Sequence, residues 1–301
     1  MTSAQYFTIT LNNNEQRIDN YLISILKNVP KSHIYKIIRK GEVRVNMKRI
    51  KPEYKLRIDD TVRIPPVKIL TLHQSTPSTN LKRLILNSII EQNDNMLVLN
   101  KPAGIAVHGG SGNKLGVIET IRKIHPEHNY FELVHRLDKA TSGCLIIAKK
   151  RSFLRYLQNE FRHRRVKKKY SAIMLGTFKN TIKCHQPLQK TITKQGDKIV
   201  KVNPQGKQAT TIFTPTKVIN NKLVLAEIEI ISGRTHQIRV HAQFINHNIL
   251  GDQKYGNDIK NDQYKTNRMF LHAKSLKFRQ QDGSNFFIEA KDDFNKQLSK
   301  A

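Results

Sequence analysis

The spacing of apolar residues near the start of the chain predicts two short helices followed by a small hairpin. Apolar residues recur at helical spacing in two stretches, Ile18, Leu22, Ile25 and Leu26, then Ile34, Ile37 and Ile38. Ser32 is placed as the N-cap of the second helix, and Gly41 suits the left-handed residue that closes it. Alternating Val43 and Val45, a polar turn and the strand-like run 61–64 follow. These elements predict a first domain over residues 15–68.

A Ser, Thr and Pro run at 75–79 has the composition of a linker, which we place at residues 69–85. Beyond it, a second domain is expected over 86–295. Strand-like runs at 96–99, 131–134, 145–148 and 224–231 are mixed there with helical patterns at 115–124 and 235–245. Strands and helices do not alternate regularly, so the fold class predicted is α+β with a mixed, mainly antiparallel sheet.

Charge is the strongest signal in the composition, with 53 Lys and Arg against 23 Asp and Glu, a formal net charge of +30. So large an excess favours a polyanionic partner, and nucleic acid is the natural one. A compositional bias toward Lys, in a chain also rich in Asn and Ile, would inflate the charge without creating it. A membrane surface is disfavoured because the basic residues do not lie opposite a long apolar helical stripe.

Other features of the composition predict a cytoplasmic protein. No apolar run approaches the length of a membrane span, and the first ten residues lack the pattern of a signal peptide. The two cysteines, Cys144 and Cys184, lie far apart and form no ligand cluster, so neither a disulfide framework nor a zinc site is expected.

Two basic stretches are candidates for contact with phosphates. The first contains Lys36, Arg39, Lys40, Arg44, Lys48, Arg49 and Lys51. The second runs from 151 to 170, where Glu160 is the single acid. A charge run is more often a solvated face. The near absence of acids in both stretches favours RNA contact instead.

The window from His135 to Gly143 is the richest in chemistry. A hydrophobic strand leads into a polar loop that holds one acid, Asp138, among His, Arg and Lys, and Thr-Ser-Gly then turns the chain into an apolar strand. Loops at strand ends are where rigid scaffolds hold reactive side chains, so Asp138 is a candidate nucleophile or base. Taken alone it would more often be a turn residue or a salt-bridge partner.

A second window, 231–241, reads Ile-Ser-Gly-Arg-Thr-His-Gln-Ile-Arg-Val-His. An alternating strand ends there in Gly233 and delivers Arg234 at the start of a helix. His236 and His241 are not spaced like paired helical metal ligands. The chain contains neither GxGxxG nor GxxxxGKS, so nucleotide hydrolysis is not indicated.

Together these motifs resemble those of RNA pseudouridine synthases of the ribosomal-large-subunit type. The resemblance rests on the two windows above, on Gly251-Asp252 with Tyr255-Gly256, and on Leu271-His272-Ala273. It covers about residues 15–290, and the motifs follow in the family's order. The first domain, with Arg17-Ile18-Asp19 and the run 41–46, resembles an S4-type RNA-binding domain.

The resemblance implies isomerisation of uridine to pseudouridine in structured large-subunit (23S) ribosomal RNA, on a flipped-out nucleotide. It gives Asp138 the role of the catalytic carboxylate and pairs Arg234 with it, so that the acid stays ionised in a dry pocket. Arg136 would fill the vacated stack, or alternatively clamp a phosphate. Tyr170 would stack on the flipped base. Leu271 would form the pocket wall, although a plain core position is an equal alternative.

The remaining expectations concern partners. Lys36, Arg39, Arg44 and Lys168 are expected to bind RNA. Neither a metal, a nucleotide nor any other cofactor is expected, because an isomerisation needs no oxidant or energy source. The protein is expected to be a monomer. A protein that only binds RNA would be indicated if Asp138 or Arg234 were missing. A glycosidic hydrolase ranks lower, because such enzymes use paired carboxylates and the window 135–143 holds one.

Overall fold

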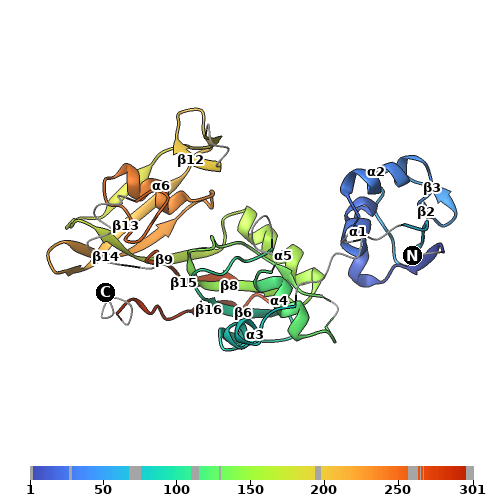
Figure 1. The fold of residues 1–301 in the computed structure, drawn as a ribbon, viewed down its shortest axis with the longest axis horizontal. Helices are drawn as coiled ribbons and strands as arrows, with labels where there is room; N and C mark the ends of the chain where they lie inside the picture. The colour runs from blue at the N-terminus through green and yellow to red at the C-terminus, as the bar shows by residue number, and fades with distance from the viewer. Residues whose placement is uncertain are drawn as a thin grey trace. The chain divides into compact units, whose positions relative to one another are not determined.

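A computed structural model of the 301-residue chain describes residues 3–26, 29–67, 76–109, 115–128, 130–193, 198–256, 264, 266 and 268–295. The chain divides into two compact units, Met1–Thr76 and Pro77–Ala301 (Figure 1). No helix among the described residues is long and apolar enough to cross a membrane. Each unit has its own hydrophobic core, and each is described separately below.

The first unit packs two helices against a four-stranded sheet whose order is β1-β4-β2-β3. Its elements are β1 (Gln5–Thr8), the 3-10 helix η1 (Leu11–Asn13), α1 (Ile18–Ile25), α2 (Lys31–Arg39), β2 (Arg44–Val45), β3 (Lys48–Arg49) and β4 (Thr61–Ile64). The apolar sides of both helices and the inward residues of β2 and β4 form one buried cluster. The expected helices, hairpin and final strand are therefore confirmed.

Two details of the first unit differ from expectation. Ser32 is not the N-cap of α2, because the helix begins at Lys31 and Pro30 is the residue before it. Pro30 has no side chain that could cap the helix, and its carbonyl accepts from the His33 amide at 2.9 Å and from the Ile34 amide at 3.1 Å. Strand β1 was not predicted; its backbone pairs with β4 from Gln5 opposite Ile64 to Thr8 opposite Thr61. Gly41 has the expected left-handed backbone, with φ of +71°.

The second unit is built on a ten-stranded sheet. The sheet runs in the order β10-β13-β14-β9-β15-β8-β6-β5, with β16 paired to β15 and β7 paired to β8. Its strands are β5 (Ile89–Gln92), β6 (Met96–Lys101), β7 (Glu132–Leu133), β8 (Ser142–Ala148), β9 (Lys167–Leu175), β10 (Ile182–His185), β13 (Thr210–Ile219), β14 (Leu223–Ile230), β15 (Leu271–Arg279) and β16 (Asn285–Glu289).

The pairing in this sheet is antiparallel except between β8 and β15, which run parallel. The predicted mixed, mainly antiparallel sheet of an α+β fold is therefore confirmed. A separate hairpin consists of β11 (Leu188–Ile192) and β12 (Lys198–Val202). The helices of this unit are α3 (Thr79–Leu86), α4 (Val117–Ile124), α5 (Arg151–Arg162) and α6 (Gln237–Phe244).

Helices cover both faces of the central strands. Alternate residues of a strand point to opposite faces, so Leu145 and Ile147 of β8 pack in the cluster formed by α3 and α4. Cys144 and Ile146 pack in the cluster that contains α5. Every residue of β8 is buried. This strand is therefore a rigid support for the loop that precedes it.

The end of the region 69–85, expected to be a linker, is helical. Helix α3 begins at Thr79, and the Ser78 side chain caps it by accepting a hydrogen bond from the Leu81 amide at 3.2 Å. The Ser-rich composition that indicated a linker thus includes an N-cap, a role for which serine is also favoured. Residues 68–75 lie outside the described residues. Both cysteines, Cys144 and Cys184, are buried and free.

Candidate active site

Asp138 lies in the loop between β7 and β8, and the backbone on both sides of it is hydrogen-bonded. The Thr141 amide donates to the Asp138 carbonyl at 3.1 Å, and the Gly104 amide donates to the Lys139 carbonyl at 2.9 Å. Gly143 then brings the chain against β15, where a Cβ atom would lie 2.3 Å from the Ala273 carbonyl oxygen. The side chain of Asp138 is 30% exposed. The loop therefore holds one accessible carboxylate on a fixed backbone.

Lys101, at the end of β6, supports the same loop from inside the protein. Its side chain is fully buried, and its ammonium donates to the carbonyls of Pro102 at 2.8 Å, Ile105 at 2.9 Å and Lys139 at 3.3 Å. Burial lowers the pKa of Lys101 to about 7, with the charge of Asp138 opposing and that of Arg268 adding to the shift. The three ammonium hydrogens match three carbonyl acceptors, one of them beside Asp138.

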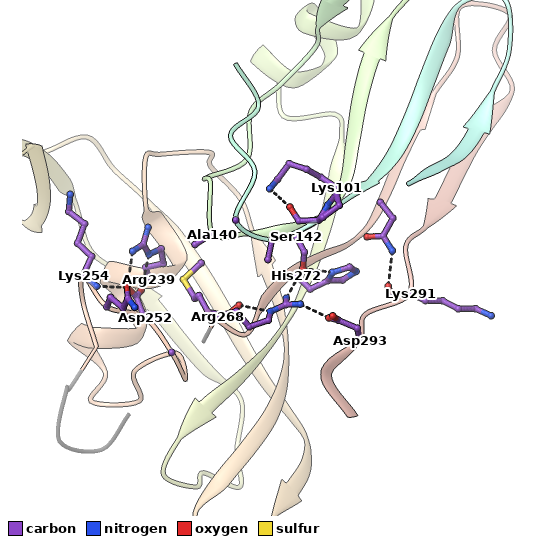
Figure 2. Close-up of a pocket in the computed structure, with 17 residues that line it drawn as sticks. Lys101, Ala140, Ser142, Arg239, Asp252, Lys254, Arg268, His272, Lys291 and Asp293 are labelled. Carbon is purple, nitrogen blue, oxygen red and sulfur yellow. Dashed lines mark hydrogen bonds and ion pairs between the residues drawn. The ribbon is translucent and has the colours of Figure 1, made fainter. Parts of the chain in front are cut away.

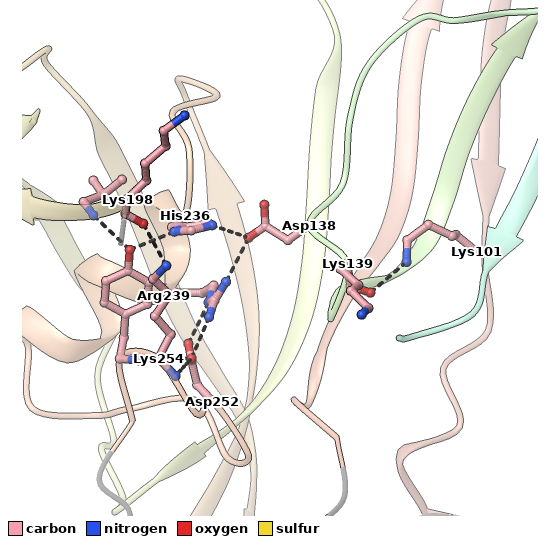
Figure 3. Close-up of polar contacts among 10 residues, drawn as sticks. Lys101, Asp138, Lys139, Lys198, His236, Arg239, Asp252 and Lys254 are labelled. Atoms are coloured by element: carbon pink, nitrogen blue, oxygen red, sulfur yellow. Dashed lines mark hydrogen bonds and ion pairs between the residues drawn. The ribbon is translucent and has the colours of Figure 1, made fainter. Parts of the chain in front are cut away.

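Arg239, on the buried face of α6, is the cation that contacts Asp138 (Figure 3). Its Nη1 lies 3.2 Å from Asp138 Oδ2. On its other edge the guanidinium makes a bidentate pair with Asp252, from Nε at 2.8 Å and from Nη2 at 2.7 Å. Burial lowers the pKa of Arg239, but the bonds to Asp252 and the charges of both carboxylates outweigh it and raise the pKa. Arg239 thus bridges two carboxylates, one of them accessible.

The structure does not show the predicted pairing of Arg234 with Asp138. Arg234 lines the same cleft, but its Nε donates to the Gln208 carbonyl at 3.4 Å. Its backbone is fixed by Gln237, whose Oε1 accepts from the Arg234 amide at 3.0 Å. Arg234 precedes α6, whereas Arg239 lies within the helix and places its Nη1 3.2 Å from Asp138 Oδ2.

His236 is a second group near Asp138 that the sequence did not single out. Its Nε2 lies 3.7 Å from Asp138 Oδ2, and its Nδ1 lies 2.7 Å from the hydroxyl of Tyr255. Burial lowers the pKa of His236; the charge of Asp138 opposes this shift, and those of Arg239 and Lys254 add to it. The residue precedes α6 in the left-handed conformation, with φ of +53°.

Asp138, Tyr170 and Leu271 meet in one cleft of about 940 Å³. Leu271 is buried and Tyr170 half-buried. Burial raises the pKa of Tyr170 above its usual value, and the nearby charge of Asp138 adds to this. A phenol with a raised pKa remains protonated at neutral pH, so Tyr170 offers a ring face and a hydroxyl, not a phenolate base.

The lining of the cleft includes Arg136 and Lys168, two basic residues expected from sequence to contact RNA, together with further lysines, among them Lys139. Arg136 is exposed and lines the cleft. Lys168 lines it as well, with its ammonium 5.8 Å from the centroid of the Phe161 ring; burial, then the charge of Arg164, lowers the pKa of Lys168. Lys190 and Lys254 also line it. The surroundings of Asp138 are therefore strongly positive.

A second hollow of about 590 Å³ lies beside the first and shares Ala140, Arg239 and Lys254 with it (Figure 2). Its two acids are both engaged by arginines, Asp252 by Arg239 and Asp293 by Arg268 at 2.5 Å. The described residues contain no group of three or more His, Cys, Asp or Glu side chains that could hold a metal ion.

The remaining basic residues of the prediction, Lys36, Arg39 and Arg44, belong to the first unit. Lys36 and Arg39 are exposed on α2, opposite its buried isoleucines. Arg44, on β2, is half-buried and donates from Nε to the Gly41 carbonyl at 3.3 Å. Lys36 and Arg39 are thus accessible to a partner.

Comparison with known proteins identifies the family. The RNA pseudouridylate synthase model matches residues 95–244, and the S4 domain model matches residues 16–62. Ribosomal large subunit pseudouridine synthase C of Haemophilus influenzae is 49% identical over 284 residues, which cover 92% of this chain and 88% of that protein. This chain belongs to the RNA pseudouridine synthase family. The family expected from the sequence motifs is thereby confirmed.

Further relatives place this pseudouridine synthase among similar sequences and structures. The Escherichia coli K12 protein named ribosomal large subunit pseudouridine synthase C is 46% identical over 288 residues, 92% of this chain and 89% of its own. In this chain the sequence segments 30–32, 48–56 and 107–112 resemble those of this subgroup. The solved structure of human RNA pseudouridylate synthase domain containing 1 has the same fold, with a TM-score of 0.60 at 24% identity, covering 70% of this chain and 85% of that one.

Proposed function

We propose that this enzyme isomerises uridine to pseudouridine in large-subunit ribosomal RNA, with Asp138 as the reacting carboxylate. The observation that supports Asp138 is its position in the lining of a cleft, accessible and bonded to Arg239, with Tyr170 and Leu271 in the same lining. The substrate is supported by the names of relatives that align along most of the chain. Because its proposed substrate is ribosomal RNA, we also propose that the enzyme acts in the cytoplasm.

The proposed reaction balances without a cofactor. The bond from C1′ to N1 breaks, the base turns, C5 joins C1′, and the proton that C5 loses is replaced by one gained at N1. Asp138 either attacks the sugar or accepts a proton from it, and both steps need the carboxylate to be ionised. A neighbouring guanidinium stabilises that form by its charge and by N–H donation. We therefore propose that Arg239, in the place first given to Arg234, keeps Asp138 reactive.

The other cleft residues are proposed to hold the displaced nucleotide. A uridine inside folded RNA must leave its stack before its C1′ can be reached. Arg136, exposed at the rim, is proposed to occupy the vacated position, because a guanidinium plane stacks on bases. Tyr170 would stack on the flipped base, and Leu271 would close the pocket. Arg234 and Lys168 are then free to contact phosphates at the rim.

The function is tested by incubating the purified protein with an unmodified large-subunit rRNA transcript and mapping pseudouridine along it. We expect conversion at discrete uridines, and we expect these sites to be unmodified in cells that lack the protein. Conversion of no uridine in any transcript, or an unchanged cellular pattern, would contradict the proposal. Conversion of uridines without preference for particular positions would contradict large-subunit rRNA as the specific substrate.

The S4 unit is proposed to add RNA affinity through phosphate contacts from Lys36, Arg39 and Arg44. Replacing the exposed pair in a Lys36→Gln, Arg39→Gln double variant should weaken binding and flatten its salt dependence. The slope of log K against log salt should fall by roughly 0.7 to 0.9 for each phosphate that the variant no longer neutralises. Binding is measured by filter retention from 50 to 300 mM salt, about the range in which such contacts are screened.

A double variant with the same change of charge elsewhere is the control. Lys82 and Arg83 are both exposed on α3 in the second unit. Lys82→Gln with Arg83→Gln should leave the salt slope near that of the unaltered protein. Equal losses of affinity in both double variants would show that net charge alone, and not the S4 unit, determines the affinity.

A further inference from the structure

The two polar neighbours of Asp138 face the same carboxylate oxygen. Arg239 Nη1 lies 3.2 Å from Oδ2, and His236 Nε2 lies 3.7 Å from the same atom (Figure 3). Among the residues that the structure describes, no hydrogen bond to Oδ1 is found. The carboxylate is therefore held asymmetrically: Oδ2 contacts Arg239 and His236, and Oδ1 accepts no hydrogen bond from the described residues.

The contacts around His236 favour one of its two neutral tautomers. The Val200 amide donates to the Tyr255 hydroxyl oxygen at 3.0 Å, and that hydroxyl lies 2.7 Å from His236 Nδ1. If Tyr255 donates its single proton to Nδ1, the proton of a neutral imidazole is on Nε2 and points at Asp138. The other tautomer would set the Nε2 lone pair against a carboxylate, which is repulsive.

The ring of His236 is fixed from several sides. Its backbone is left-handed immediately before α6, and its carbonyl accepts from the Val240 amide at 3.0 Å. The His236 and Tyr255 rings meet edge to face at 5.4 Å, and the Arg239 guanidinium lies 5.0 Å from the Tyr255 ring centroid. Asp252, which binds Arg239, also accepts from the Tyr255 amide at 3.1 Å. His236, Arg239 and Tyr255 thus form one connected support.

We propose that His236, oriented by Tyr255, is a positioning residue that donates from Nε2 to Oδ2 of Asp138, so that Oδ1 is the oxygen presented to the nucleoside. This inference rests on the proposed function. The gap of 3.7 Å is longer than a hydrogen bond. A small turn of the carboxylate when uridine enters would close it. Arg239 supplies the positive charge that stabilises the ionised carboxylate of Asp138. The hydrogen bond from His236 fixes the rotation of that carboxylate about its Cβ–Cγ bond, which charge alone does not fix.

The groups that face His236 agree with a neutral donor. Burial is the largest influence on its pKa and lowers it; the charges of Arg239 and Lys254 also lower it, and those of Asp138 and Asp252 oppose the shift without cancelling it. At neutral pH the ring is therefore uncharged and carries one proton, as the tautomer argument requires. The Tyr255 hydroxyl has a raised pKa, chiefly through burial, and so keeps the proton that it donates to His236.

Two substitutions at His236 distinguish the loss of the hydrogen-bond donor from the loss of the imidazole ring. In His236→Gln the side-chain amide places an N–H near the position of Nε2, whereas in His236→Asn the shorter amide cannot reach Asp138. Asparagine tolerates the left-handed backbone better than glutamine, so strain cannot explain a defect confined to the Asn variant. Tyr255→Phe removes the hydroxyl that orients His236 and leaves its imidazole in place.

We expect His236→Asn to lower kcat by about 10- to 100-fold at nearly unchanged KM, the range that corresponds to losing a hydrogen bond to a charged group. His236→Gln should stay within about fivefold of the unaltered enzyme, and Tyr255→Phe should fall between them. The readout is release of tritium from an rRNA transcript labelled at C5 of uridine. Rates are measured under single-turnover and steady-state conditions.

The outcomes distinguish this inference from the proposed function. An inactive unaltered enzyme would contradict the function itself. An active enzyme whose Asn and Gln variants lose activity equally, or whose Asn variant changes KM alone, would overturn the role of His236. Thermal unfolding of all three variants shows whether they fold. Should His236→Asn fail to fold, an undiminished kcat in Tyr255→Phe would still overturn the proposal.

Discussion

Asp138→Asn should abolish pseudouridine formation while the fold and the affinity for RNA persist. The amide is nearly the same size as the carboxylate and can still accept a hydrogen bond from Arg239 Nη1, which lies 3.2 Å from Oδ2. It can neither attack C1′ nor take a proton from the sugar at a useful rate. We expect the rate to fall by at least about a thousandfold, as when a reacting group is removed from other enzymes. Tritium release measures turnover, and filter binding measures affinity.

The matched control is Asp94→Asn, the same chemical change at an exposed acid between β5 and β6. It should leave turnover unchanged. Turnover by Asp138→Asn within tenfold of the unaltered enzyme would remove this carboxylate from the reaction. A variant that neither binds RNA nor unfolds cooperatively would show that the residue acts on structure, and Asp138→Ser would then be the next substitution to compare.

Much of the fold could be predicted because the apolar patterns that form its helices and strands involve residues close together in the sequence. The apolar spacing of α1 and α2 and the unbroken apolar run of β8 depend on residues close together in the sequence. Strand β1 and helix α3 were missed for a different reason. Strand β1 has an alternating pattern only four residues long and owes its existence to pairing with β4, while the polar residues around Ser78 suit both a linker and an N-cap.

The candidate site was predictable as a set of motifs but not as a set of contacts. Asp138 was found because an acid among cations at a strand end stands out within one window. Arg234 and Arg239 occupy the same second window, and their positions in the sequence do not show which of them contacts the carboxylate in the folded chain. The motif that contains Asp252 and Tyr255 was visible too. Its partners are distant in sequence, so its role as the support of Arg239 and His236 required the folded structure.

Arg239→Lys should reduce turnover about a hundredfold or more, and the corresponding Arg234→Lys change should stay within about fivefold. Arg239 uses three nitrogens to bind two carboxylates, at 2.7, 2.8 and 3.2 Å. A lysine ammonium is a single point of charge and cannot span Asp252 and Asp138 together. Asp252 is only 1% exposed, so it would retain the lysine and leave Asp138 without a cation.

This pair of arginine variants decides which arginine keeps Asp138, the proposed catalytic carboxylate, in place. Both substitutions preserve the net charge, so neither RNA attraction nor salt dependence should separate them. Arg239→Lys should also lower the midpoint of thermal unfolding, because the bidentate bonds to buried Asp252 are broken, whereas the Arg234 side chain donates to the Gln208 carbonyl, a contact with an uncharged acceptor. The decisive measurement is the single-turnover rate at saturating RNA. A large loss of rate in Arg234→Lys together with a small one in Arg239→Lys would reverse the assignment, and it would mean that substrate binding reorganises the loop before α6.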